Sequence, residues 1–122
     1  LFLPKYNIGI EYDGVFWHNS KQALEQKKNQ IFEKLNIKFI RIREFGLSTT
    51  GITNGTEILM EGPASHDTLA NCINSLFLYL QSTLGLKLNQ VSNTDIKANE
   101  KHIRNQYHFS YQENNILNCK KR

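Results

Sequence analysis

The most informative segment of the sequence reads Ile8-Gly9-Ile10-Glu11-Tyr12-Asp13-Gly14-Val15-Phe16-Trp17-His18. Side chains two positions apart share one face of a β-strand, so the alternation up to Asp13 predicts a strand with an apolar face and an acidic face. The acidic face carries Glu11 and Asp13, and the apolar face carries Ile8, Ile10 and Tyr12. The Asp-Gly pair that follows is typical of a turn. Two carboxylates are therefore expected side by side at the end of a strand.

Paired carboxylates at a strand end suit a metal ion. Two carboxylates a few Å apart repel each other unless one is protonated or a cation lies between them, and hard cations such as Mg²⁺ prefer oxygen ligands. His18 follows shortly after the turn, so its imidazole could fold back over the strand end and accept a proton from water near neutral pH. The segment therefore indicates a site where a metal ion, a base and a water molecule meet.

Each part of this segment also has a purely structural interpretation. A Glu-Asp pair at a strand end is commonly a solvated edge, a single histidine commonly packs or caps, and Phe16 and Trp17 are residue types found in cores. The combination favours a functional site, because the strand, the two acids, the glycine turn, the aromatic pair and the histidine fall within eleven positions.

The surrounding pattern predicts the order strand, strand, helix, strand. Residues 1–12 contain two apolar runs separated by turn residues, which indicates a hairpin or two adjoining strands. A helix of about four turns is expected to begin at an N-cap at Ser20. Its core-facing apolar stripe is expected at Leu24, Ile31 and Leu35, with Ala23 and Phe32 beside them. Residues 37–43 are rich in β-branched types and mostly alternate, which predicts a strand. This order predicts an α/β fold.

The second half of the chain predicts a long loop and a further helix. Residues 44–65 are rich in Gly, Thr, Ser and Asn, which indicates a loop that can hold a short strand at residues 57–60. A helix capped by Ser65 or Asp67 and ended by Gly85 carries a continuous apolar stripe. That stripe predicts packing against the sheet.

Composition limits the class of protein. The 122 residues fit one ordinary domain, and 39% hydrophobic with 21% charged residues is the balance of a globular protein. No apolar run is long enough to span a bilayer, so a soluble protein without a membrane partner is expected. Two cysteines, Cys72 and Cys119, are too few for a disulfide framework and indicate a reducing, cytoplasmic location. The net charge of +4 permits a polyanionic partner without identifying one.

The motif residues resemble a known nuclease family. Residues 11–18, the Lys-rich helix, and residues 37–44 with Leu47 are similar to the core of the very-short-patch-repair (Vsr)-like endonucleases. These enzymes belong to the PD-(D/E)xK, or restriction-endonuclease-like, superfamily, which includes phage homing endonucleases and zinc-ribbon-associated bacterial proteins. The resemblance covers residues 1–47 well, and it implies a restriction-endonuclease-like mixed β-sheet flanked by helices.

The resemblance also implies how the chain is divided. Residues 1–93 would form a Vsr-like nuclease core, with a helix up to about residue 85, and residues 94–122 would form a C-terminal helix and a basic tail. The C-terminal helix is expected from about Thr94 or Asp95 to Tyr107. Counted back from the motif, the family's principal metal-binding aspartate falls just before Leu1, and the acid of a preceding helix is also missing. We therefore expect an N-terminally truncated core that by itself has little or no activity.

The catalytic residues implied by the resemblance are Glu11, Asp13, His18 and Glu44. Glu11 takes the acidic position of the (D/E)-x-K strand, and Glu11, Asp13 and the backbone carbonyl of Tyr12 would hold Mg²⁺ or Mn²⁺. His18 matches the histidine of a Phe-Trp-His signature that assists the attacking water or the leaving group. Asp13 departs from the family, because it stands where relatives have lysine or histidine and so removes a positive partner for the scissile phosphate. The implied reaction is phosphodiester hydrolysis in DNA.

Five basic side chains are candidates for contacts with DNA phosphates, each of which would make binding salt-dependent. They are Lys21, Lys27, Lys28, Arg41 and Arg43. Lysines on the outer face of a helix are commonly only solvated. At least one of the two arginines is expected either to snorkel or to pair with a carboxylate such as Glu44.

Two other functions stay open at the level of sequence. One is a non-catalytic nucleic-acid-binding module with the same fold, and the other is a small domain whose acidic pair is only structural. The sequence also leaves open the DNA target, whether one strand or two are cut, the number of metal ions, the oligomeric state, and a role in repair, restriction or intron mobility.

Overall fold

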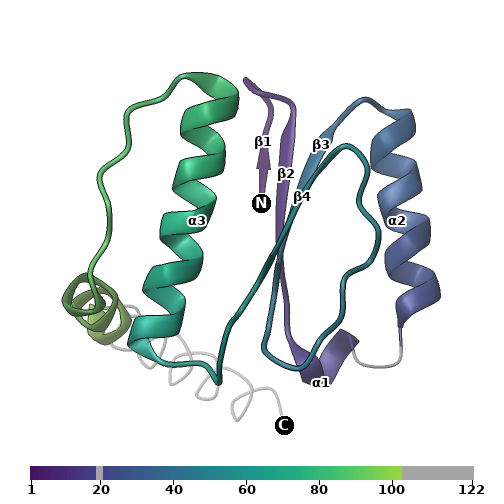
Figure 1. Cartoon of the computed structure of the whole chain (residues 1–122). Helices are drawn as coiled ribbons and strands as arrows, with labels where there is room; N and C mark the ends of the chain where they lie inside the picture. The colour runs from purple at the N-terminus through teal and green to yellow at the C-terminus, as the bar shows by residue number, and fades with distance from the viewer. Residues whose placement is uncertain (19–20, 103–122) are drawn as a thin grey trace, which may run out of the picture.

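A four-stranded sheet lies between two long helices in the computed structural model, which describes residues 1–18 and 21–102 (Figure 1). The strands are β1 (Phe2–Leu3), β2 (Ile8–Asp13), β3 (Lys38–Arg43) and β4 (Gly55–Leu59), in the spatial order β1-β2-β3-β4. β1 pairs with β2 antiparallel, whereas β2–β3 and β3–β4 are parallel. This arrangement confirms the prediction of an α/β fold with a mixed sheet.

The two long helices follow the predicted order with shifted boundaries: α2 (Gln22–Lys34) and α3 (His66–Leu84). The short helix α1 (Val15–His18) was not predicted from the sequence. α2 begins after Lys21, and the predicted cap Ser20 lies outside the described residues. The predicted ends of α3 are confirmed, because the hydroxyl of Ser65 accepts a hydrogen bond from the backbone N–H of Thr68 in a capping box, and Gly85 adopts a left-handed conformation with φ of 69°.

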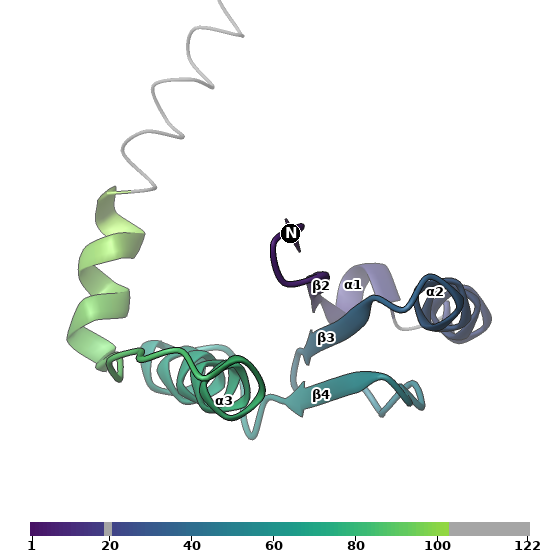
Figure 2. The same ribbon diagram turned by 90° about the horizontal axis from the view of Figure 1, so that it is seen from above.

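A fourth helical segment covers residues 93–102, close to the predicted start near residue 94, and its predicted continuation to Tyr107 lies outside the described residues. Figure 2 shows this segment running away from the N-terminal half of α3. Two side-chain pairs join it to the first turn of α3: Asn93 with Asp67 at 2.8 Å, and His66 with Glu100. None of the helices in residues 1–18 and 21–102 has the combination of length and apolar character that crossing a bilayer requires.

The hydrophobic core lies between the sheet and α3. Ile8 and Ile40 are fully buried on this face, and Leu80 of α3 packs against them. Further apolar side chains that pack on this cluster are Leu3, Tyr6, Ile10, Ile58, Leu76, Tyr79, Leu84 and Leu88. The predicted stripe on α3 therefore does face the sheet, as its spacing requires.

The opposite face of the sheet is covered by α2, and here the predicted helix orientation is wrong (Figure 2). The centre of the stripe expected in the core is exposed: Leu24, Ile31 and Leu35 keep 64%, 48% and 60% of their surface. Phe32, predicted beside them, does pack against Phe39 of β3. The side chain that α2 buries most completely is Glu25. The reason lies in β3, whose two arginines face α2 and need acceptors, since an unpaired buried guanidinium is far more costly than an exposed leucine.

The predicted strand within the long loop is confirmed as β4, although it begins two residues earlier than expected. Gly55 opens it with φ of 152°, and a Cβ at that position would lie 1.9 Å from the carbonyl oxygen of Phe39, so only glycine fits. Glu57 then fixes the preceding loop. Its Oε1 accepts hydrogen bonds from the backbone N–H and the hydroxyl of Thr50, at 2.7 and 2.5 Å.

Candidate functional site

The predicted acidic face of β2 meets two arginines of β3. The parallel register sets Glu11 beside Arg41 and Asp13 beside Arg43. Asp13 is fully buried, and its two carboxylate oxygens accept hydrogen bonds from Arg41 Nη1 at 3.0 and 2.9 Å. Its Oδ2 also accepts a bond from Arg43 Nη1 at 2.8 Å. The carboxylate of Asp13 is therefore held by two guanidinium groups inside the protein.

α2 completes this buried ion cluster, which consists of Asp13, Glu25, Arg41 and Arg43. Glu25 Oε1 accepts a hydrogen bond from Arg43 Nη1 at 2.9 Å, and Asn29 Oδ1 accepts one from Arg41 Nε at 2.9 Å. Burial alone would lower the pKa of Arg43, but the bonds to Glu25 and Asp13 raise it above its usual value. Two carboxylates thus balance two guanidinium groups, and this balance is the reason that α2 turns a polar side toward the sheet.

Glu11 lies at the open edge of this cluster. Its Oε2 accepts a hydrogen bond from Lys28 Nζ of α2 at 2.8 Å and lies 3.6 Å from Arg41 Nη1. The side chain of Glu11 is 27% exposed and that of Lys28 47% exposed, so the pair faces solvent. Both residues line a groove of about 470 Å³ between α2 and the β1–β2 side of the sheet. Glu11 is thus the accessible member of the predicted acidic pair.

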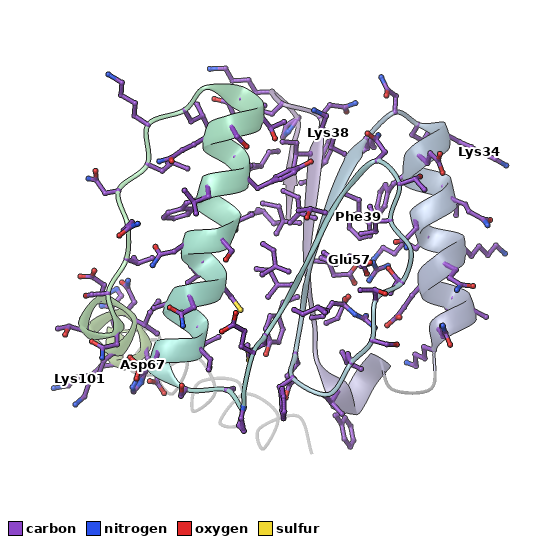
Figure 3. All side chains as sticks on the ribbon, in the orientation of Figure 1. Lys34, Lys38, Phe39, Glu57, Asp67 and Lys101 are labelled. Carbon is purple, nitrogen blue, oxygen red and sulfur yellow. The ribbon has the colours of Figure 1, made fainter. Side chains whose placement is uncertain are left out.

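The remainder of the groove is mainly aromatic and aliphatic. Phe32 of α2 and Phe39 of β3 line it with their ring centroids 4.5 Å apart, and Phe2 and Ile37 also contribute. Figure 3 shows Phe39 and Glu57 in the space between the sheet and α2. Lys28 Nζ lies 5.9 Å from the centre of the Phe39 ring, so the ammonium connects the polar and the apolar ends of the groove.

This geometry bears on one of the predicted metal ligands, Asp13. Glu11 and Asp13 do converge, but on the guanidinium of Arg41 rather than on an open space between oxygens. The assignment of Asp13 as a metal ligand is therefore wrong for this arrangement, because its oxygens are occupied by buried hydrogen bonds. In the described ranges 1–18 and 21–102, no three or more His, Cys, Asp or Glu side chains gather in a way that could hold a metal ion.

The other predicted catalytic residues lie apart from the acidic pair or outside the described side chains. Glu44 follows β3, and its Oε2 accepts a hydrogen bond from the backbone N–H of Val15 at 3.1 Å, which caps the short helix α1. It also forms a hydrogen bond with the phenol of Tyr12, on the sheet face opposite Glu11. His18 is the last residue of α1, and its side chain lies outside the described part of the structure. The roles of His18 and of the Tyr12 carbonyl stay predictions.

The contact between Tyr12 and Glu44 makes a pH-dependent prediction. Burial, the charge of Glu44 and the hydrogen bond between the two raise the pKa of the Tyr12 phenol above its ordinary value. A raised pKa means that the neutral phenol stabilises the fold below about pH 10, and that this contribution is lost as the pH rises through the pKa of the folded state. We expect Glu44→Gln to lower this pKa.

The measurement is a titration of phenolate absorbance. Since the chain has five tyrosines, the signal of Tyr12 is isolated as the difference between each protein and its Tyr12→Phe counterpart. A residual upward shift from burial is expected to remain in Glu44→Gln. An unchanged titration in that variant would show that the carboxylate does not act on the phenol.

The predicted DNA contacts divide into two groups. Lys21 at the N-cap of α2 and Lys27 and Lys28 on the helix are exposed, so phosphates can reach them. Arg41 and Arg43 are only 1% and 3% exposed, so the prediction that they contact DNA phosphates is wrong for this structure. The expectation that an arginine pairs with a carboxylate is confirmed, but the partners are Asp13 and Glu25 rather than Glu44.

Sequence reasoning missed Glu25 and Asn29 as partners of the arginines. A signal was present, because two arginines on one strand face require acceptors from whatever packs on that face.

Three comparisons with known proteins found no match: no family model matches the sequence, no curated protein is significantly similar to it, and no solved structure matches the fold. The resemblance to the Vsr-like endonucleases therefore stays a prediction based on the motif residues.

Proposed function

We propose that this chain is the core of a metal-dependent DNA endonuclease of the Vsr-like or homing-endonuclease type. The observation that supports the proposal most strongly is the register between β1 and β2. Phe2 pairs with Gly9, and Leu1 and Ile10 exchange both backbone hydrogen bonds, at 2.8 and 2.7 Å. One further step in this register sets the position directly before Leu1 opposite Glu11. Opposite residues in an antiparallel pair project to the same face.

This register supports the proposal, because the motif resemblance calls for an aspartate directly before Leu1. An acid directly before Leu1 would lie beside Glu11, at the polar end of the groove and next to Lys28. The residues now present do not by themselves make a complete magnesium site, because Asp13 is occupied by arginines. Glu11, the Tyr12 carbonyl and the added acid are the oxygen donors that we propose. A divalent ion held there would stabilise charge on the phosphate and lower the pKa of water.

Lys28 is the cation that we propose at the scissile phosphate. The motif has Asp13 where relatives carry a basic or imidazole group, and Lys28 brings a positive charge from α2 to the other acid of the motif, 2.8 Å from Glu11. Lys21 and Lys27 extend the exposed positive charge along the helix. In this proposal His18 acts as the proton acceptor, and Glu44 positions the short helix that ends at His18 by binding its first N–H.

The test compares two extended versions of the chain that differ only in a carboxylate or a carboxamide at the position before Leu1. One begins Met-Asp before Leu1 and the other begins Met-Asn, so that both extend β1 equally and only the first supplies a carboxylate. We expect supercoiled plasmid to be cut by the Met-Asp version with Mg²⁺ or Mn²⁺, and not by the Met-Asn version. Equal cleavage by both, or cleavage by neither, contradicts the proposed site.

A non-catalytic nucleic-acid-binding module is the second candidate function. The specific observation in its favour is that Asp13 is fully buried and forms an ion pair with Arg43, so its carboxylate does not bind a metal in this arrangement. If both extended versions bind duplex DNA with the same salt dependence and neither cuts it, this candidate replaces the first, because binding through lysines needs no metal site.

A further inference from the structure

The exposed stripe on α2, formed by Leu24, Ile31 and Leu35, is an apolar surface without a partner among the described residues. The three side chains recur at spacings of seven and four, so they lie on one side of the helix. A helix of a globular domain normally buries such a stripe. Here the side of α2 that faces the sheet instead carries Glu25, which binds Arg43 in the buried ion cluster. The stripe is therefore left for something outside the described fold.

The stripe is continuous with the groove beside it. Phe32 lines the groove and lies three residues before Leu35, and Lys28 lines it and lies three residues before Ile31. Residues three or four apart are neighbours on a helix surface. Phe2, which is half exposed, forms part of the opposite wall. Together these side chains make a concave apolar surface between a helix and a sheet, a shape that receives another helix rather than a flat surface.

The charges around the stripe indicate which kind of partner surface can bind there. Lys27 and Lys34 lie on the side of the stripe away from the sheet, and both are exposed. The acid Glu33 lies on the opposite side of the helix from the stripe. A second copy of α2 would bring lysines against lysines, and duplex DNA would set phosphates against leucine and isoleucine. Acidic side chains flanking an apolar face complement this surface.

We propose that this surface binds an amphipathic helix of a partner protein that carries acidic residues along one edge of its apolar face. The partner's apolar side chains pack on Ile31, Leu35 and the aromatic end of the groove, and its carboxylates face Lys27 and Lys34. The proposal goes beyond nuclease activity and does not depend on it, since Ile31, Leu35 and Lys34 lie outside the proposed catalytic site. Lys27 is also a proposed DNA contact, and it is therefore left unchanged in the variants below.

The probe is a synthetic peptide of about 18 residues, or five helical turns, with leucines at heptad positions a and d and glutamates beside them. Its matched control has lysine in place of every glutamate. We expect the acidic peptide to bind at least about 10-fold more tightly than the basic one at low salt, with the difference shrinking as salt rises. Fluorescence anisotropy of labelled peptides measures both constants.

Variants of the chain locate the binding surface. The double variant Ile31→Gln with Leu35→Gln is expected to weaken the acidic peptide about 10-fold or more, whereas Leu78→Gln, at an equally exposed leucine of α3, is expected to leave it unchanged. Lys34→Glu is expected to reduce the preference for the acidic peptide, because Lys27 then remains as the only lysine on that side of the stripe. Because these side chains are exposed, thermal unfolding should be nearly the same in all variants.

Four results would each overturn the proposal. They are equal binding of the two peptides, no effect of the double variant, a dimer in light scattering that the double variant dissociates, and loss of duplex DNA binding in the double variant. The third would assign the surface to a second copy of this chain, and the fourth would assign it to DNA.

Discussion

Replacing Asp13 by asparagine is expected to lower the free energy of unfolding by about 3–5 kcal/mol. Asp13 is fully buried and accepts bonds from Arg41 and Arg43, which are themselves almost completely buried. Removing its charge leaves Arg43 with the carboxylate of Glu25 and Arg41 with the partly exposed carboxylate of Glu11, 3.6 Å away. Since small domains are stable by only about 5–15 kcal/mol, this single change is expected to remove a large part of the total stability.

Urea unfolding followed by circular dichroism measures the effect, and Glu11→Gln is the matched control. Glu11 is on the same strand and face, but its pair with Lys28 is exposed, so its loss is expected to cost no more than about 1 kcal/mol. The double variant Asp13→Asn with Arg41→Met is expected to be more stable than the sum of the single changes predicts, since it removes a buried charge with its partner. A cost for Asp13→Asn no larger than for Glu11→Gln would mean that the buried ion cluster does not hold α2 to the sheet.

The part of the fold that sequence reasoning predicted is the part that depends on local chemistry. Ser65 and Gly85 mark the ends of α3 because a hydroxyl cap and a left-handed glycine are requirements of the helix ends themselves. Period-two alternation likewise predicted that Glu11 and Asp13 share one face of a strand. Neither inference needs knowledge of what packs against the element.

The orientation of α2 could not be predicted in the same way. A hydrophobic stripe indicates the buried side of a helix only where the opposing surface is also hydrophobic. Here β3 presents Arg41 and Arg43 to α2, so Glu25 and Asn29 face the sheet and the stripe turns outward. The decisive information is the parallel register of β2 with β3, which sets Asp13 beside Arg43 across a connection that contains the whole of α2.

In the candidate site, too, the sequence predicted what depends on local chemistry and not what depends on the neighbouring strand. The sequence predicted that two carboxylates converge, but a carboxylate pair is compatible with a metal ion or with a guanidinium, and only the neighbouring strand decides between them. The side chain of Glu11 points to the groove and pairs with Lys28, whereas Asp13 is enclosed. One acidic motif thus supplies a buried structural charge and an accessible one.

Glu11→Gln in the version of the chain that begins Met-Asp is expected to reduce the rate of plasmid nicking about 100-fold or more while changing the free energy of unfolding by less than about 1 kcal/mol. Glutamine keeps the shape of the side chain and a hydrogen-bonding oxygen, but it removes the charge that a divalent ion and Lys28 both require. Glu11→Gln is therefore expected to lower activity with little effect on stability, whereas Asp13→Asn is expected to lower stability strongly.

Single-turnover cleavage with excess enzyme isolates the chemical step from product release. The control is Glu33→Gln, which neutralises an exposed acid on the same helix as Lys28 and is expected to leave the rate within about 2-fold of the parent, because surface charges away from a site have small effects. Raising the Mg²⁺ concentration should restore part of the rate in Glu11→Gln if the lost carboxylate acted mainly by binding metal. A cleavage rate that is the same with glutamate and glutamine at position 11 would mean that phosphodiester hydrolysis, if it occurs, takes place somewhere other than the polar end of this groove.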